Sequence, residues 1–584
     1  MMISGNARSA FLLAGLLGAS MSASGKSIYV AASGGSDQNP GSSPSAPLAT
    51  IAAASSRAVA GDTVYLLAGQ YHESIVPQSS GTPGHPITYT SYNGAAVISN
   101  VRVGVLISSL GYITIDGINV NGGSTPPNAN VSTFVSIANS NHIIVQNGNF
   151  KYANGWSGID IAGKYLANGA FWQSAAGNAL GGKTSYITIQ NNTIDSVGDY
   201  SVPNGDDIQA SNGDIDHVLI QHNTVLHGGH DLVQFDVDYG VVQNNTLNNS
   251  FADTVGGDTG YRSIELRGSY NIVQGNLMEH SRLGGGSYVA PIASLRGVAN
   301  IVRQNVFYDG IAGGTGTWCG PGSNDGVTNG RIYNNTLSQL GGDAWSIWAY
   351  TGCTSLGGFV FANNLVLNSR MSPGTIPNVQ HGGTLIDADV VFMPTGAGAS
   401  IGGGPTASSV VKGNLFYPSG GGPAYVYLSG GGKVALNAAS SSYPQAFMAN
   451  VQSRPTLASA SPAVLADFQQ APSSPGMGAG VFLTSVVGSG TSTNLTVADS
   501  LYFSDGNNLV PGDTIQLQGS TQRAVVLSIN RNSNTLTLSA ALSFKDGQGV
   551  ALAYNGNAPD IGAGGTQTAP SVKPMAPTRV VVGR

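Results

Sequence analysis

The chain has 584 residues, of which only 9% are charged and 83 are glycine, so it has the length for several domains and the composition of a neutral protein rich in turns. Its formal net charge of -6 argues against a protein that binds nucleic acid through a general basic surface. Any acidic ligand must therefore be bound by a local cluster of cations, and we expect few helices.

The first segment, residues 1–24, has the features of a secretory signal peptide. It carries one arginine, then an apolar run from Ala10 to Ala19, and then small residues that allow cleavage. The run is too short to span a membrane, and no other stretch reaches the roughly eighteen apolar residues that a span needs. The sequence therefore predicts an exported protein, periplasmic or extracellular, without membrane insertion.

The next segment predicts the start of a β domain. A first strand from Ser27 is followed by a short helix from about Leu48 to Val59 and by a turn at Gly61 and Asp62. Further strands follow the turn. We expect the helix to cover the end of a stack of strands, because such an end otherwise exposes core and strand edges.

A short motif then repeats along the chain, with a run of β-branched residues, one asparagine and another apolar residue in each copy. One copy is too small to form a hydrophobic core, so neighbouring copies must stack. Equivalent asparagines then lie above one another at the strand spacing and exchange amide hydrogen bonds. These ladder asparagines are Asn192, Asn223, Asn245, Asn276, Asn305, Asn335, Asn364 and Asn414.

The repeat and the N-terminal segment together carry a family resemblance. The N-terminal motifs are "SIYVAASGGSDQNPGSSPSAPLATI", "AGDTVYLLAGQYHESIV" and "GTPGHPITYTSYNGA". They resemble secreted polysaccharide-degrading proteins with a right-handed parallel β-helix, the pectate-lyase-like superfamily. The resemblance implies an all-β solenoid with an N-terminal cap over residues 25–475. Such β-helices have several activities, so the chemistry has to be argued from the site.

The pattern changes after about Pro475. Residues 476–565 alternate apolar and polar residues between turns, which predicts a small antiparallel β-barrel or sandwich, inserted before a closing segment "APDIGAGG". Residues 566–584 are expected to form a flexible tail. Cys319 and Cys353 are the two cysteines, and in an oxidising compartment they have the separation of about one repeat that would allow a disulfide. Two separate thiols are the alternative.

Charged residues recur at a fixed distance from the ladder. Counting back nine residues from successive ladder asparagines gives Lys183, Asp214, Asp236, Arg267 and Arg296. If the register holds, these side chains form one column, with about 4.8 Å between coils. Counting back eleven residues gives a second polar column on the same face, because two residues along a strand restore the side. The second column comprises Asn212, Gln234, Glu265 and Ser294.

Two interpretations of these columns remain open. One is a surface ladder of ion pairs, each contributing under about 1 kcal/mol. The other is a groove for an acidic sugar, because Arg267 and Arg296 repel each other unless an anion lies between them. In that case Asp214 and Asp236 are the candidate ligands of Ca²⁺, the one cofactor that the sequence suggests, since oxygen ligands suit this ion.

Histidine and carboxylate residues lie near these columns. His230 is followed by Asp231 in "HGGHDLVQFDVDYG", and we predict it as a general base or acid. Lys183 is the alternative base. The other expected catalytic residues are Arg267 and Asp231. The residues expected to bind substrate are Arg262, Arg296, Gln234, Glu265, Tyr261 and Asp207.

The favoured hypothesis is a polysaccharide lyase acting on an acidic, uronate-containing polymer by β-elimination. It requires a cation at the C6 carboxylate and a base at the C5 proton. Related lyases typically use a lysine base, but no lysine occurs between Lys183 and Lys412. Epimerisation at C5 starts with the same proton abstraction, so an epimerase stays open.

Two further hypotheses compete with the lyase. A hydrolase resembling polygalacturonases would use two carboxyl groups, Asp207 and Asp231, roughly 5 to 9 Å apart. The lysine of that family's Arg-x-Lys element is missing after Arg262. The second competitor is a non-catalytic surface protein that binds polysaccharide. In each case the partner is an acidic polysaccharide, and we expect a monomer.

Overall fold

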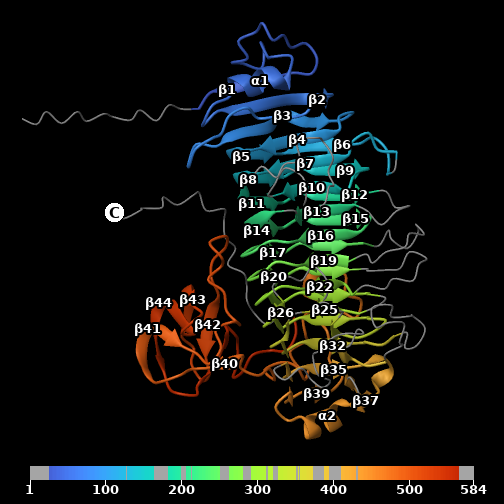
Figure 1. Cartoon of the computed structure of the whole chain (residues 1–584), viewed down its shortest axis with the longest axis vertical. Coiled ribbons are helices and arrows are strands. Elements are labelled where there is room, and N and C mark those ends of the chain that lie inside the picture. The colour runs from blue at the N-terminus through green and yellow to red at the C-terminus, as the bar shows by residue number, and fades with distance from the viewer. Residues whose placement is uncertain are drawn as a thin grey trace, which may run out of the picture.

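The computed structural model describes residues 25–126, 128–162, 182–198, 205–211, 213–249, 262–279, 291–310, 313–319, 326–349, 353, 355–371, 387–393, 409–428 and 432–564. The predicted signal peptide and tail lie outside these residues. The described chain winds into a long stack of coils, with a small β domain beside its C-terminal half (Figure 1). In this part of the chain no helix is long and apolar enough to cross a membrane.

The N-terminal end of the stack is covered by a helix, as the sequence predicts. The first elements are β1 (Ser27–Val30), α1 (Ile51–Arg57), β2 (Thr63–Tyr71) and β3 (Ile87–Ile98). The helix begins after Thr50, whose side chain accepts a hydrogen bond from the N–H of Ala53. The Glu73 carboxylate accepts from the next free N–H groups, at 2.6 Å for Ile51. This end of the stack lies at the top of Figure 1.

Below the cap, the coils carry up to three short strands, and equivalent strands of neighbouring coils pair in parallel. One stack forms a 12-stranded sheet. Its strands are β4 (Val103–Ser108), β7 (Thr133–Ala138), β10 (Ser157–Ala162), β13 (Asp206–Ser211), β16 (Asp231–Phe235), β19 (Arg262–Leu266), β22 (Ala293–Leu295), β25 (Thr315–Cys319), β29 (Trp345–Ala349), β33 (Val390–Met393), β36 (Tyr425–Leu428) and the antiparallel β37 (Gly432–Ala435).

The other two stacks belong to a 25-stranded sheet that bends at a corner of each coil. Before the corner lie β5 (Gly111–Asp116), β8 (Asn141–Gln146), β11 (Lys183–Gln190), β14 (Asp214–Gln221), β17 (Val241–Gln243), β20 (Ile272–Gln274), β23 (Ile301–Arg303), β27 (Arg331–Tyr333), β31 (Val360–Ala362), β34 (Val410–Lys412) and β38 (Phe447–Met448). After it lie β6 (Ile118–Asn121), β9 (Asn149–Ala153), β12 (Thr193–Val197), β15 (Thr224–Gly228), β18 (Thr246–Asn248), β21 (Leu277–Glu279), β24 (Val306–Tyr308), β28 (Thr336–Ser338), β32 (Leu365–Leu367), β35 (Leu415–Tyr417) and β39 (Val451–Gln452).

The predicted asparagine ladder lies at this corner and is confirmed. Asn276 is representative: its Oδ1 accepts from the backbone N of Asn245 at 2.9 Å and from its Nδ2 at 3.0 Å. The Nδ2 of Asn276 donates to the carbonyl of Val242 and to Asn305 Oδ1, both at 2.9 Å. The amides therefore satisfy buried backbone groups where the chain turns and fix the register of the stack.

Asn276→Ala is expected to lower the free energy of unfolding by about 1 to 3 kcal/mol, because it leaves several buried donors and acceptors without partners. Denaturant unfolding measures the change. The exposed Asn532 of the small domain offers a matched control, and its alanine variant should unfold like the parent. Equal stabilities of the two variants would contradict the role of the ladder.

The interior of the stack is filled by apolar side chains that alternate with the polar columns of the 12-stranded sheet. Phe235 and Leu266 are fully buried and Leu295 is 6% exposed, as the alternation predicts. Cys319, at the end of β25, forms a disulfide with Cys353, so the predicted pairing is confirmed. Two short strands, β26 (Val327–Thr328) and β30 (Leu356–Gly357), pair beside it.

The small C-terminal domain is an antiparallel sheet packed against the stack of strands that precede the corner. Its strands run in the order β40, β45, β42, β43, β44, β41. Arg303 of the stack donates to Asp513 at 2.7 Å and to Tyr333, so a buried ion pair fixes the domain. The bounds are β40 (Thr484–Ser485), β41 (Gly490–Thr496), β42 (Thr514–Leu517), β43 (Arg523–Asn530), β44 (Thr535–Phe544) and β45 (Gly549–Leu552).

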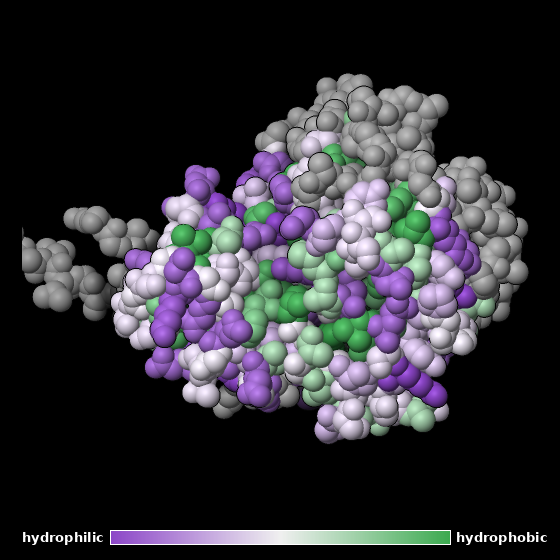
Figure 2. All heavy atoms as spheres, turned by 90° about the horizontal axis from the view of Figure 1, so that it is seen from below, coloured by the Kyte–Doolittle hydropathy of each residue, from purple (hydrophilic) through white to green (hydrophobic). Residues whose placement is uncertain are grey.

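The C-terminal end of the stack carries α2 (Leu436–Ser442) and a short 3-10 turn, Ser419–Gly421, whereas the 3-10 turn Leu465–Phe468 packs through Phe468 against Tyr308 of β24. Seen from this end, polar residues cover much of the surface and apolar ones gather near the middle of the view (Figure 2). Tyr443, just after α2, is 41% exposed there. After the small domain the chain returns to the stack, where the N–H of Gly562 donates to the carbonyl of Asn363.

Candidate active site

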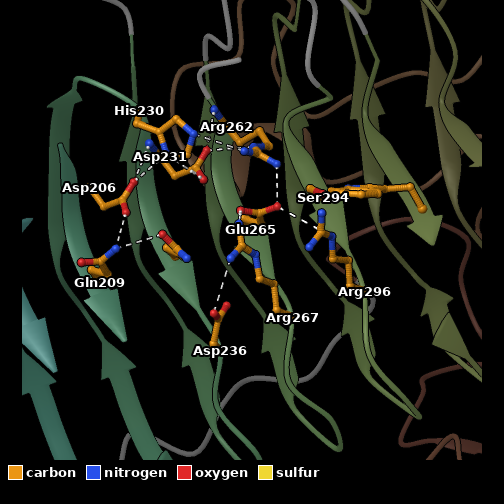
Figure 3. A network of polar contacts seen from close by, with 12 residues as sticks. Asp206, Gln209, His230, Asp231, Asp236, Arg262, Glu265, Arg267, Ser294 and Arg296 are labelled. Carbon is orange, nitrogen blue, oxygen red and sulfur yellow. Dashed lines mark hydrogen bonds and ion pairs between the residues drawn. The ribbon is translucent and has the colours of Figure 1, made fainter. Parts of the chain in front are cut away.

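Polar side chains follow the outer side of the 12-stranded sheet from β13 to β22 in three columns (Figure 3). The strand register aligns Gln209 with Gln234, Gln234 with Glu265, and Glu265 with Ser294. Another column lies at the first residue of each strand and consists of Asp206, Asp231 and Arg262. The third follows the strand ends with Asp236, Arg267 and Arg296. Charges that are far apart in the sequence thus become neighbours.

The structure corrects the predicted column at its first two members. Lys183 pairs in register with Asp214 as predicted. However, both lie at the start of β11 and β14, which belong to the 25-stranded sheet and not to the 12-stranded one. Asp236 instead follows β16, and its N–H donates to the carbonyl of Ala210 at 2.8 Å. Ala210 and Leu219 align with Phe235 and Val241, so nine residue steps in one coil match six in the next. The coil of Asp214 thus has three more residues between its strands than the next coil. Counting back nine residues from its asparagine therefore does not reach the 12-stranded sheet.

The same displacement corrects the second predicted column. Gln209 takes the place that was expected for Asn212, a residue that lies outside the described part of the chain. The rest of that column, from Gln234 to Ser294, is aligned as predicted.

Lys183 is therefore separated from the network of Figure 3. Its side chain is 51% exposed and forms ion pairs with Asp214, at 3.8 Å, and with Asp216. The hydrogen bond that Lys183 donates to Asp216 raises the pKa of Lys183, against the small effect of burial, and so favours the charged form. A lysine in this state is a poor base, so the geometry argues against Lys183 as the proton acceptor.

The two residues expected to bind Ca²⁺ do not converge. Asp214 is 69% exposed beside Lys183, whereas Asp236 lies 3.5 Å from Arg267 Nη1. Each carboxylate is already paired with a cation, and the two come from different sheets. The two residues therefore do not fit a shared calcium site.

His230 is held by two carboxylates and faces an arginine. Its Nδ1 lies 2.9 Å from Asp206 Oδ1 and 3.4 Å from Asp231 Oδ2. Arg262 Nε donates to Asp231 Oδ1 at 2.9 Å, and Arg262 Nη2 lies 3.5 Å from His230 Nε2. Burial lowers the pKa of His230, but the charge of Asp231 and the hydrogen bond to Asp206 outweigh it and raise the pKa to about 9. The imidazole is therefore protonated at neutral pH.

The same residues are the one set of three metal-ligand side chains within 4.8 Å of each other in the described part of the chain: Asp206, His230 and Asp231. Asp206 Oδ1 and His230 Nδ1 are hydrogen-bonded to each other, and Asp231 Oδ1 accepts from Arg262 Nε. A metal ion would lie beside this guanidinium, so we assign the set to holding the imidazole.

Glu265 joins the three arginines of the face. Its oxygens accept from Arg262 Nη1 at 2.8 Å and from Arg267 Nη2 at 2.6 Å, and Arg296 Nε lies 3.9 Å away. Burial raises the pKa of Glu265, but Arg262, Arg267 and Arg296 outweigh it and lower the pKa to about 2. Both oxygens are engaged and the side chain is 1% exposed, so Glu265 orients the arginines, which departs from its expected contact with sugar.

Arg296 is the least compensated cation of this face. Its guanidinium carbon lies 3.1 Å from the ring centroid of Trp318, whose Nε1 donates to Ser294 Oγ at 2.7 Å. Nε of Arg296 is buried and has no hydrogen-bond partner among the described residues. Burial lowers the pKa of Arg296 to about 10. A buried guanidinium whose charge is incompletely compensated is suited to lie beside an anion.

Gln234 links the histidine and arginine halves of the site. In the amide orientation that satisfies both of its ends, it donates to Asp206 Oδ2 at 2.7 Å and accepts from Arg267 Nη1 at 3.0 Å. Three side chains reach solvent: His230 is 25% exposed, Asp236 28% and Arg267 35%. Burial raises the pKa of Asp236 to about 6. The accessible part of the site thus offers an imidazole, a carboxyl group and a guanidinium.

Two predicted substrate contacts are not available. Asp207 is fully buried and both of its oxygens lack partners within the described residues. It points toward the backbone of the coil, since a Cβ on Gly228 would lie 2.4 Å from Asp207 Oδ2. Burial raises the pKa of Asp207 well above its usual value and so favours its neutral form. Tyr261 lies outside the described residues.

The buried position of Asp207 also weakens the hydrolase hypothesis. Asp231, the second carboxyl group in that scheme, is likewise fully buried and holds Arg262. Asp206 and Trp318, by contrast, belong to the site without having been predicted. Asp206 was visible as the neighbour of Asp207 in "GDD", and Trp318 lies in the coil after Arg296.

Comparisons with known proteins found a short sequence match and distant structural neighbours. No protein-family model matches the chain. The uncharacterized protein YwoF of Bacillus subtilis (strain 168) is 44% identical over 75 residues, which are 13% of this chain and 16% of that protein. Among solved structures, the pectate lyase Pel9A is 14% identical, covers 92% of this chain and 96% of its own, and has a TM-score of 0.40.

Two other solved structures are similarly distant. The PL6 family alginate lyase AlyGC is 14% identical, with 68% of this chain and 48% of that chain covered and a TM-score of 0.40. The GH136 lacto-N-biosidase from Eubacterium ramulus is 14% identical, with 63% and 68% covered and a TM-score of 0.35. The parallel strand pairing of the structure itself confirms the predicted parallel β-helix, and these distant likenesses add no argument about activity.

Proposed function

We propose that the chain is a polysaccharide lyase that cleaves an acidic, uronate-containing polymer by β-elimination. The observation that carries the proposal is the pair of neighbouring cations Arg267, which is 35% exposed, and Arg296, whose buried Nε has no hydrogen-bond partner among the described residues. A uronate carboxylate supplies the missing acceptor and relieves the repulsion between the two cations. Neutralising the carboxylate makes the C5 proton of the sugar more acidic.

His230 is the proposed base for this proton. Asp206 and Asp231 hold the Nδ1 side of its ring, which leaves Nε2 as the atom that exchanges protons. As the C5–H bond breaks, its electron pair forms the C4–C5 double bond, and the C4–O bond to the neighbouring sugar breaks. The leaving oxygen takes up a proton. Because the pKa of His230 is raised, we expect this chemistry to need alkaline solution.

Export is part of the proposal, since a polymeric substrate lies outside the cell. Residues 1–24 support export by their signal-peptide features, and the disulfide between Cys319 and Cys353 supports an oxidising compartment. The proposed partner is the acidic polysaccharide itself.

Incubating the purified protein with alginate, pectate and glycosaminoglycans tests the proposal. We expect ultraviolet absorbance from 4,5-unsaturated sugar ends to rise together with new reducing ends on at least one of them. New reducing ends without unsaturation would instead identify a hydrolase. Neither product on any of these polymers would overturn the lyase.

A further inference from the structure

The 12-stranded sheet continues from His230 toward the N-terminus through β13 and β10. Three residues occupy the position directly before their strands: Trp156, Gly205 and His230. The N–H of Asp206 donates to the carbonyl of Trp156 at 2.9 Å, and the N–H of His230 donates to the carbonyl of Gly205 at 3.1 Å. The three therefore lie in one column, each about 4.8 Å from the next.

Trp156 is an exposed aromatic residue in this column. It is 43% exposed, which is unusual for a side chain with so large an apolar surface. Gly205 contributes no side chain between Trp156 and His230, which lie two strand spacings, roughly 10 Å, apart. A Cβ on Gly205 would meet the Cα of Gly198 at 2.3 Å, so packing requires glycine there.

The ionisable groups of the face differ on the two sides of His230. Asp160, which aligns with Gln209 and whose pKa burial raises to about 7, and Asp206 lie on the N-terminal side. Arg267 and Arg296 lie on the C-terminal side. A sugar near Trp156 is therefore bound through its apolar face, because the C–H groups of a pyranose pack on the π face of an indole. The carboxylate-bearing sugar lies toward the arginines.

We propose that Trp156 is a stacking platform for a second sugar of the polymer, at the N-terminal end of a site that extends to Arg296. This inference rests on the proposed function for the identity of the polymer. From the coil of Trp156 to that of Arg296 there are four strand spacings, roughly 19 Å. The site then binds an oligosaccharide of several sugars, with contacts on both sides of His230. Cleavage would therefore occur at an internal bond of the polysaccharide.

Binding of oligosaccharides of increasing length tests this platform. Calorimetry in a His230→Ala background, with fragments of alginate, pectate and chondroitin as probes, measures binding without cleavage. We expect Trp156→Ala to weaken binding of the long fragments by about tenfold and of the shortest ones little. Trp156→Phe should retain most of the affinity. Tyr443→Ala, which removes an equally exposed aromatic residue near α2, is the matched control.

The outcomes separate the platform from the proposed reaction. The platform is supported if the affinity of the parent rises with fragment length and Trp156→Ala loses this gain. This holds even if the parent protein releases no unsaturated products. Equal binding of all lengths by Trp156→Ala and its parent overturns the platform, whether or not the parent is a lyase. Absence of binding to every fragment by the parent overturns it as well.

Discussion

Replacing Arg296 by alanine is expected to lower kcat/KM on the cleaved polymer by about 10²- to 10³-fold. The guanidinium is fixed against Trp318, and its Nε has no partner among the described residues, so its positive charge is incompletely compensated and in place before a ligand arrives. Negative charge on the carboxylate increases as the C5 proton leaves. The loss should therefore fall on kcat as well as on KM.

The stability of the Arg296→Ala protein distinguishes this role from a structural one. Removing a buried cation that is incompletely paired relieves a desolvation cost, so we expect the melting temperature to stay level or to rise. Arg454→Ala, at an exposed arginine near the C-terminal end of the stack, should change neither activity nor melting temperature. Parental turnover by Arg296→Ala would contradict the assignment, as would inactivity that accompanies loss of the fold.

The fold was predictable because each coil repeats the same physical solution. A buried amide at the corner has to satisfy the backbone groups of the neighbouring coil, so Asn276 and its equivalents recur in the sequence. The alternation of Gln234, Phe235 and Asp236 likewise follows from the opposite sides that successive residues take in a strand. These signals are local, and they survive changes in loop length.

The site was only partly predictable, because columns depend on the length of every turn between them. Arg267 and Arg296 align as expected since their coils have equal turns before the ladder, whereas the three additional residues before Leu219 displace Asp214. Counting back nine residues from the next ladder asparagine, Asn335, gives Gly326, but the strand register places Trp318 beside Arg296 in the following coil. Insertions of this kind do not change the sequence of the repeated motif, so the repeat does not reveal them.

The partners of His230 could not be chosen from the sequence either. Asp206 and Asp207 are adjacent acidic residues, and both are buried in the structure. Asp206 holds the imidazole, while Asp207 points into the coil against Gly228. Which of the two faces outward depends on the backbone at the start of β13, where the strict alternation of a strand has not yet begun.

Replacing His230 by glutamine is expected to lower kcat by about 10²- to 10⁴-fold, and the pH dependence of the parent should show why. The base must be neutral. Burial and Arg262 lower the pKa of His230, but the charge of Asp231 and the hydrogen bond that His230 donates to Asp206 outweigh them and raise the pKa to about 9. Below this value the logarithm of kcat/KM should rise by about one per pH unit, and above it the profile should level off.

The same titration should change stability in the opposite direction. Because the pKa of His230 in the folded protein exceeds the ordinary value of 6.5, its charged form stabilises the fold fully below pH 6.5, and this contribution is lost as the pH rises through about 9. Activity should thus increase while the free energy of unfolding falls, and His230→Gln should remove this part of both trends. A kcat/KM that instead falls between pH 7 and 9 would show that the protonated imidazole is the active form, which is the behaviour of a general acid and not of the base that β-elimination requires.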